Sequence, residues 1–243
     1  MNRQQLRGAV LVLSFILMSV TFAYISPSGM MTGLSQGVIA AALIFWIAMF
    51  LLTFLVGRAF CGYLCPMGAE QEIIDRVVKI DLRTVPYLRY LKYLFAALWV
   101  GSAVFLAAVA GGLVLDPLFS IGSGLPPYPA PMYLFLYGMM LGVFLLVVLL
   151  GRRGMCNYLC PMSVVFIAIS AIKNRLMIPS LHLEADNKDC IRCKRCTGVC
   201  PMSLPVQEMV AAGAMQEPEC IVCGNCAGTC PKGCIRLAWG WGR

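Results

Sequence analysis

The chain has 243 residues, of which 60% are hydrophobic and only 12% are charged, and its formal net charge is +8 at pH 7. This composition excludes an ordinary soluble globular domain and is typical of a membrane protein. The positive charge does not indicate a nucleic-acid partner, because an excess of Lys and Arg next to anionic lipid is the usual bias of membrane proteins.

Four apolar runs lie before residue 151, and each is close to the ~20 residues of helix that cross a bilayer core. They cover residues 8–25, 38–56, 91–110 and 132–150. Lys92 lies at the edge of the third run, where its amine can snorkel toward the lipid headgroups. A fifth apolar stretch, residues 164–172, is too short to span, so we expect it to lie at the interface or to pack against the other helices.

The loops between the runs differ in charge. Residues 26–37 carry no charged side chain and residues 111–131 carry only Asp116, whereas the Lys and Arg residues lie on the opposite side or at its edge. By the positive-inside rule, both termini are therefore cytoplasmic. We expect a multi-pass protein of a prokaryotic inner (cytoplasmic) membrane, with four transmembrane helices that form two hairpins.

The membrane part, residues 1–178, repeats a short motif. Residues 57–68 read GRAFCGYLCPMG and residues 151–163 read GRRGMCNYLCPMS, so the copies share Cys-x-Tyr-Leu-Cys-Pro-Met. Each copy follows a predicted hairpin and lies on the cytoplasmic side. This predicts two parallel repeats about an axis along the membrane normal.

Each copy presents a Cys-x3-Cys pair, whose thiols lie about one helical turn apart on one face. If the two pairs face each other across the axis, they form a four-thiolate site for a third centre. Its ligands would be Cys61, Cys65, Cys156 and Cys160. An iron–sulfur cluster or a mononuclear iron is the leading hypothesis, ahead of zinc. The alternative is that these thiols are reduced and structural, or form redox-active disulfides.

Residues 179–243 carry two copies of a denser motif, Cys-x2-Cys-x2-Cys-x3-Cys-Pro. This is the ligand run of a ferredoxin with two 4Fe–4S clusters, in which the fourth Cys of each copy binds the other cluster. We expect one cluster on Cys190, Cys193, Cys196 and Cys230, and the second on Cys220, Cys223, Cys226 and Cys200. Structural zinc and disulfides are the alternatives, but zinc sites usually show two Cys-x2-Cys pairs or add His. The remaining Cys234 is interpreted as a spare buried thiol.

The predicted fold therefore has two parts. Residues 1–178 form a membrane all-α domain, with four transmembrane helices arranged as two parallel repeated hairpins. Residues 179–243 form a C-terminal α+β domain of the two-cluster ferredoxin-like type. We expect this domain on the cytoplasmic side, where reducing conditions keep thiols available as ligands.

The two Cys-x3-Cys-Pro copies and the eight ferredoxin cysteines resemble those of the NapH/MauN type of membrane ferredoxin, whose core motif is shared with NosR and CcoG proteins. The resemblance covers nearly the whole chain. It implies the quinol dehydrogenase subunit of an oxidoreductase complex, which passes electrons from the quinone pool toward a respiratory reductase. Quinone or quinol as substrate and other redox subunits as partners are implied by this resemblance.

With this resemblance, the predicted function is electron transfer between the quinone pool and a partner redox protein through iron–sulfur clusters. No catalytic site for a soluble substrate is visible, so partners are implied. The alternative is an assembly or maturation factor that reduces or delivers a metal to a respiratory enzyme. No sequence signature marks a quinone site. Glu70, Glu72 and Asp75 are candidate proton-accepting groups, but we interpret them as the solvated face of an amphipathic helix.

Overall fold

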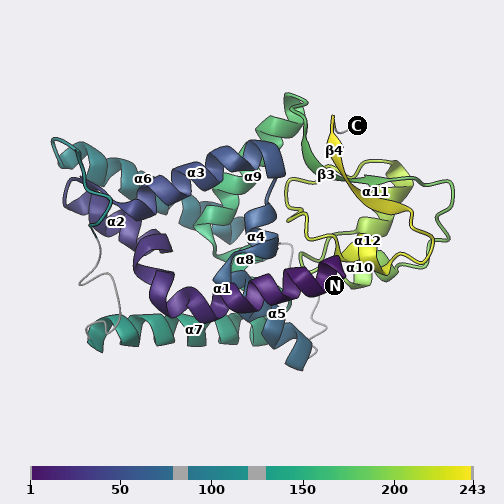
Figure 1. Cartoon of the computed structure of the whole chain (residues 1–243), viewed down its shortest axis with the longest axis horizontal. Helices are drawn as coiled ribbons and strands as arrows, with labels where there is room; N and C mark the ends of the chain where they lie inside the picture. The colour runs from purple at the N-terminus through teal and green to yellow at the C-terminus, as the bar shows by residue number, and fades with distance from the viewer. Residues whose placement is uncertain (1, 79–86, 120–129, 242–243) are drawn as a thin grey trace.

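The computed structural model describes residues 2–78, 87–119 and 130–241, and these ranges form a long helical part joined to a small part with two strands (Figure 1). The helical part has two layers. One layer contains α1, α5 and α7, and the other contains α2, α3, α6 and α9 (Figure 1). The helices of the two layers are α1 (Arg3–Ile25), α2 (Pro27–Ser35), α3 (Ala41–Val56), α5 (Pro66–Val78), α6 (Leu91–Val109, after the 3-10 turn Tyr87–Tyr90), α7 (Ala130–Leu150) and α9 (Pro161–Arg175).

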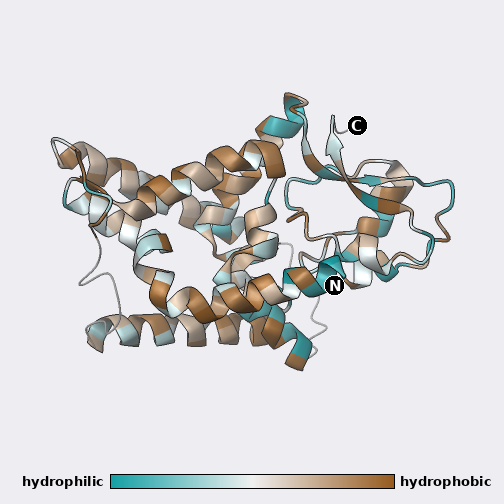
Figure 2. Cartoon of the chain, viewed as in Figure 1, coloured by the Kyte–Doolittle hydropathy of each residue, from teal (hydrophilic) through white to brown (hydrophobic). Residues whose placement is uncertain are grey.

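The long helices consist mainly of apolar residues (Figure 2), and many of these residues are exposed. Leu51 on α3, Leu98 on α6 and Leu134 on α7 are 63%, 64% and 77% exposed. A soluble protein rarely exposes so continuous an apolar surface, so it indicates contact with lipid. Among the described residues, three segments are long and apolar enough to cross a membrane: Arg3–Ser35, Tyr87–Val109 and Ala130–Leu150.

The helix α3 is shorter than the apolar run that predicted it. Its 16 residues rise about 24 Å, less than the roughly 30 Å of a hydrocarbon core. The run is shortened because Val38–Ile39 form β1, which pairs in parallel with β2 (Val114–Leu115). The predicted set of four full-length spans therefore stays a prediction. This pairing, with a Val114 N–H to Gly37 C=O bond of 2.9 Å, holds the loops after α2 and α6 together at one end of the helices.

The two Cys-x3-Cys-Pro motifs fold alike. Each begins with a five-residue helix, α4 (Ala59–Tyr63) or α8 (Gly154–Tyr158), and each continues into a helix that begins with proline. The helix α5 packs against α7, and α9 packs against α3. Each repeat thus packs its last helix on the long helix of the other. The stretch 164–172 lies inside α9 and packs against the other helices, where Phe166 is 1% exposed.

The C-terminal part is built on an antiparallel pair, β3 (Ser180–Ala185) with β4 (Ile235–Gly240), in which Ser180 lies opposite Gly240. Its helices are short: α10 (Arg195–Gly198), α11 (Val206–Ala212) and α12 (Asn225–Thr229). A small core of buried apolar side chains fills the space between them. It includes Leu183, Met202, Leu204, Val206, Val210, Met215, Ile221 and Ile235. The domain boundary at residues 178 and 179 stays a prediction.

The C-terminal part lies beyond the N-terminal end of α1 and rests directly on the helical part (Figure 1). Gly62 of α4 approaches the loop after Cys220 so closely that a Cβ atom on it would lie 2.5 Å from the Ile221 carbonyl oxygen. Only glycine fits there. Gln4 of α1 donates a 3.1 Å hydrogen bond to the Cys223 carbonyl. The second ferredoxin motif therefore lies against α1 and α4 of the membrane part.

Candidate metal centres

The two ferredoxin loops follow the same backbone path. Arg192 and Lys194 in the first loop have φ angles of 54° and 59°, and Val222 and Gly224, 30 residues later in each case, have 53° and 71°. Left-handed backbone is unfavourable for a β-branched residue such as Val222. It persists where the surrounding structure requires it, and functional sites are common among such places. This repeated backbone path curls each loop, so that the first three cysteines of each loop face a common cavity.

Two cavities group the eight ferredoxin thiols. The first, of about 370 Å³ with its mouth included, is lined by Cys190, Cys193, Cys196 and Cys230, together with Cys234. The second, of about 380 Å³, is lined by Cys200, Cys220, Cys223 and Cys226. These are the two sets that the spacing predicts, with Cys200 and Cys230 exchanged between the motifs. Their role as cluster ligands stays a prediction that this grouping supports.

The two cavities differ in their surroundings. The first lies at the surface, where Cys193 is exposed and Arg192, Lys194, Arg195 and Lys232 surround the opening. The second is enclosed by apolar side chains such as Leu183, Met209 and Met215. It also lies against α4, as the contact at Gly62 shows. The second cavity is therefore the inner one, and the first is accessible to a partner.

The thiols in these cavities are poor ligands until a cation displaces their protons. Within the described residues none of the thirteen cysteines forms a disulfide. Burial raises the pKa of Cys220 to about 12 and also raises that of Cys226. Hydrogen bonds from the Cys234 and Lys232 backbone outweigh burial at Cys230 and lower its pKa. A bound metal deprotonates such thiols outright, so the sites suit a metal more than a free thiolate.

The four membrane cysteines line one cavity of about 1200 Å³, mouth included. They lie on matching turns, because the Cys65 N–H bonds to the Phe60 carbonyl and the Cys160 N–H to the Met155 carbonyl, both at 2.9 Å. Burial raises the pKa of Cys65, and the charges of Cys61, Cys156 and Cys160 raise it further. The thiols of the two repeats therefore lie close together, as a shared site requires.

In the part of the chain that the structure describes, no three His, Cys, Asp or Glu side chains converge tightly enough to hold one metal ion. A 4Fe–4S cluster is held by four Cys thiolates that bind different iron atoms, so its ligands stand farther apart than those of one ion. A shared centre on Cys61, Cys65, Cys156 and Cys160 stays a prediction.

Two buried arginines beside this cavity indicate that it fits an anionic cluster. Arg58 and Arg153 each lie three residues before the first Cys of a repeat, each caps the short helix there, and each is 1% exposed. Among the described groups, Nε and Nη2 of Arg58 and Nε of Arg153 have no hydrogen-bond partner. A buried guanidinium without partners is costly. An iron–sulfur cluster with four thiolates is anionic, so these residues fit it.

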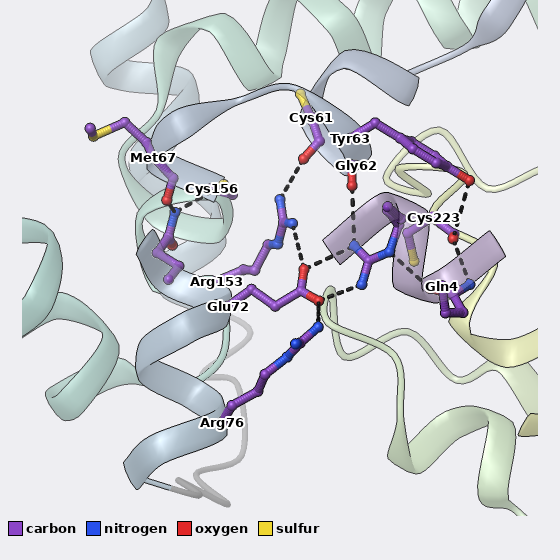
Figure 3. A network of polar contacts seen from close by, with 12 residues as sticks. Gln4, Cys61, Gly62, Tyr63, Met67, Glu72, Arg76, Arg153, Cys156 and Cys223 are labelled. Atoms are coloured by element: carbon purple, nitrogen blue, oxygen red, sulfur yellow. Dashed lines mark hydrogen bonds and ion pairs between the residues drawn. The ribbon is translucent and has the colours of Figure 1, made fainter. Parts of the chain in front are cut away.

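The two arginines have different partners. Arg153 lies 3.3 Å from the Glu72 carboxylate and donates to the Cys61 carbonyl at 2.7 Å (Figure 3). Glu72 also accepts from Arg7 of α1, which is 1% exposed. Arg58 instead donates to the Glu219 carbonyl at 3.0 Å, directly before Cys220. Arg58 therefore connects the membrane thiols to the inner ferredoxin loop.

Two sequence-based interpretations are wrong here. Glu70 and Glu72 do not form a solvated helix face, because they are 7% and 8% exposed. Lys92 does not snorkel to lipid headgroups, because it is fully buried and pairs with Glu219 at 2.6 Å. The reason is the same in both cases: the other repeat and the C-terminal part cover the ends of these helices. The arginines Arg58 and Arg153 were missed, although their equal offset from Cys61 and Cys156 was visible.

Replacing Arg58 tests its electrostatic role. In Arg58→Gln, we expect the membrane centre to have a midpoint potential lower by about 60 mV, the shift that a tenfold change in equilibrium constant gives a one-electron couple. The reason is that a nearby cation favours the reduced cluster. Arg58→Lys keeps the charge and should restore most of the potential, and the exposed Arg236→Gln is the control. Redox titration followed by EPR measures the shift, and an unchanged potential in Arg58→Gln would contradict this role.

Replacing the fourth cysteine of each motif with Ser tests which cluster that cysteine binds. Cys230→Ser should alter the EPR signal of the exposed cluster of Cys190, Cys193 and Cys196, whereas Cys200→Ser should alter that of the inner cluster. The reason is that a cluster that loses one of four thiolates changes its potential and its stability. The signals are assigned by comparison with Cys193→Ser and Cys223→Ser. The opposite pattern would show that each motif holds its cluster with its own four cysteines.

Comparisons with known proteins match both kinds of site. A family described as a 4Fe-4S binding domain matches residues 38–84 and again residues 133–179, which are the two membrane repeats. A family described as a 4Fe-4S dicluster domain matches residues 182–231. The first match is informative, because it places an iron–sulfur family on the repeats that carry Cys61, Cys65, Cys156 and Cys160. No solved structure matches the chain.

Among curated proteins, the chain is 25% identical over 202 residues to YccM of Escherichia coli, named as a candidate electron transport protein, with 74% of the chain and 52% of YccM covered. It is 27% identical over 198 residues to the methylamine utilization ferredoxin-type protein MauN of Methylorubrum extorquens, with 73% and 58% covered. It is 26% identical over 155 residues to the ferredoxin-type protein NapH of Haemophilus influenzae, with 59% and 47% covered. The chain thus spans about half the length of these relatives.

Proposed function

We propose that this chain, which is similar to the electron transport protein YccM and to the ferredoxin-type proteins MauN and NapH, is the membrane electron-transfer subunit of an oxidoreductase complex. It carries single electrons between the quinone pool and a partner redox protein. A bound 4Fe–4S cluster supplies one-electron redox chemistry. The chain itself binds the clusters, sets their order and shields them from water.

One observation carries this proposal: three cysteine-lined cavities lie in series. The membrane cavity of Cys61, Cys65, Cys156 and Cys160 adjoins the inner ferredoxin cavity through α4 and Arg58. The inner cavity belongs to the same small domain as the exposed one. The series therefore runs from the apolar interior of the helices to the surface at Cys193, where another redox subunit can approach.

The proposed placement is a prokaryotic inner membrane, with both termini and residues 179–243 on the cytoplasmic side. Three candidate spans support a membrane protein. The β1–β2 pair supports the orientation, because it holds the two loops that are poor in charge at one end. Arg3, Arg58 and Arg152 lie at the opposite end, where they contact the C-terminal part.

Quinol-dependent reduction tests the proposal. The full chain is reconstituted anaerobically in lipid vesicles, its iron and sulfide are measured, and a quinol is added. We expect EPR signals of reduced clusters to appear, and a quinone added later to reoxidise them. An assembly factor would keep its clusters oxidised under these conditions, even though dithionite reduces them. That result in a fully loaded sample would contradict the proposal.

A further inference from the structure

Beyond its four cysteines, the membrane cavity has a second region that the cysteines do not explain. It lies between the two helical layers and receives side chains from α1, α3, α7 and α9. Its walls are apolar and aromatic, and they include Met18, Phe22, Trp46, Phe135, Met139 and Phe166. Four thiols and any cluster on them occupy only one end, so the remaining space is available to a second ligand.

The cavity reaches from the C-terminal end of α1 to the thiols. At the far end lie the hydroxyls of Ser26 and Ser28, 3.0 Å apart. At the thiol end lie Gln71 and Arg58, whose Nε and Nη2 have no partner within the described part of the chain. Among the described residues, no acidic side chain lines this cavity. Its apolar walls favour an uncharged ligand, and the Ser26 and Ser28 hydroxyls at the far end can donate to an oxygen acceptor.

The cavity opens toward lipid between α1 and α7. Phe135 lines the cavity and is nevertheless 54% exposed, so its side chain lies at the opening of the cavity. Its ring contacts that of Phe22, with 6.2 Å between the centroids. The outer surfaces of these helices are apolar, as Ile16 at 63% and Leu134 at 77% exposed show. A ligand that enters here arrives from the membrane rather than from water.

We propose that this cavity binds the ring of a lipid-soluble quinone, with its isoprenoid tail leaving past Phe135. The role of the quinone as redox partner rests on the proposed function, and the location of its site is the new element. A quinone ring is flat, uncharged and carries carbonyl acceptors, which matches an aromatic chamber with hydroxyl donors at its far end. The ring then shares one cavity with the membrane thiols, so electrons need not cross the helices before reaching the first centre.

Binding of decylubiquinone and of menadione to the purified, delipidated full chain tests the site. The occluding variant is Met139→Trp, since Met139 lines the cavity. The matched control is Tyr137→Trp on the same helix, where Tyr137 is 63% exposed. We expect Met139→Trp to weaken binding about tenfold or more, as expected when a site that encloses its ligand is filled. Equal affinities in Met139→Trp and the wild type would overturn the site.

A photoreactive azidoquinone gives a second measurement that needs no variant. Mass spectrometry should find the label on α1 near Phe22 or on α7 near Met139, and excess decylubiquinone should prevent it. Labels confined to lipid-facing residues such as Leu98 and Phe105 would overturn the site. A label in the cavity that only phospholipid displaces would also overturn it and would show that a lipid acyl chain occupies the cavity. Iron and sulfide are measured in the same samples. Saturable binding without quinol-dependent cluster reduction would support the site but contradict the proposed function. Cluster reduction without binding in this cavity would support the proposed function but contradict the site.

Discussion

Replacing Cys61 or Cys156 with Ser is expected to remove about four of about twelve iron atoms per chain, with the matching sulfide, because a 4Fe–4S cluster needs four thiolates. The two cysteines lie in different repeats and line one cavity. Loss of either should therefore remove the same centre, and the two variants should have the same spectrum. The remaining irons belong to the ferredoxin part, whose cavities contain neither residue.

Cys234→Ser is the matched control for this measurement. Cys234 is buried and lines the exposed ferredoxin cavity, but it lies outside both predicted ligand sets. We expect this variant to keep all its iron and its sulfide. If Cys61→Ser and Cys156→Ser also keep the iron content and spectra of the parent, the shared membrane centre is wrong and these thiols are structural.

Replacing Glu72 with Gln is expected to destabilise the chain by about 3–5 kcal/mol, the usual cost of removing one partner of a buried ion pair. Glu72 compensates Arg7 and Arg153, and both arginines are 1% exposed. In Glu72→Gln they lose the one carboxylate that pairs with them among the described residues, while they stay charged. Thermal unfolding in detergent measures the difference. Glu184→Gln is the control, because its pair with Arg236 lies at the surface.

The same carboxylate makes the stability depend on pH. Burial raises the pKa of Glu72, but hydrogen bonds from Arg7 and the charges of Arg7 and Arg153 outweigh it and hold the pKa at about 2. A lowered pKa stabilises the folded state above the ordinary value of 4.5, and this contribution is lost as the pH falls toward about 2. The difference between wild type and Glu72→Gln should therefore shrink below pH 4.5. A difference that stays constant down to acid pH would contradict this account.

The sequence allowed the local grouping of the cysteines to be predicted, because cluster ligands come from short loops with a strict spacing. The exchange of Cys200 and Cys230 followed from that spacing alone, and the two cavities group the thiols in the same way. The equivalence of the two membrane motifs was also visible, since seven positions of the shared core align.

The polar contacts between distant segments were not predictable. Arg7 and Glu72 are 65 residues apart, and Lys92 and Glu219 are 127 apart. Charge patterning along one helix shows which face is polar, but not whether another segment covers that face. For this reason Glu72 and Lys92 were assigned to solvent and to lipid headgroups. The cavity beside Trp46 and Phe166 depends on the packing of several helices, so no single run of sequence reveals it.

Quinol-dependent reduction of the two ferredoxin clusters, compared between wild type and Cys61→Ser, tests the central claim most directly. Both proteins are reconstituted in vesicles, and dithionite confirms that their ferredoxin clusters are loaded and reducible. In the proposed route the membrane centre lies between the quinone and the inner cluster, so quinol should reduce these clusters in the wild type and fail to do so in Cys61→Ser. Equal rates in the two proteins would contradict a route through the membrane cysteines.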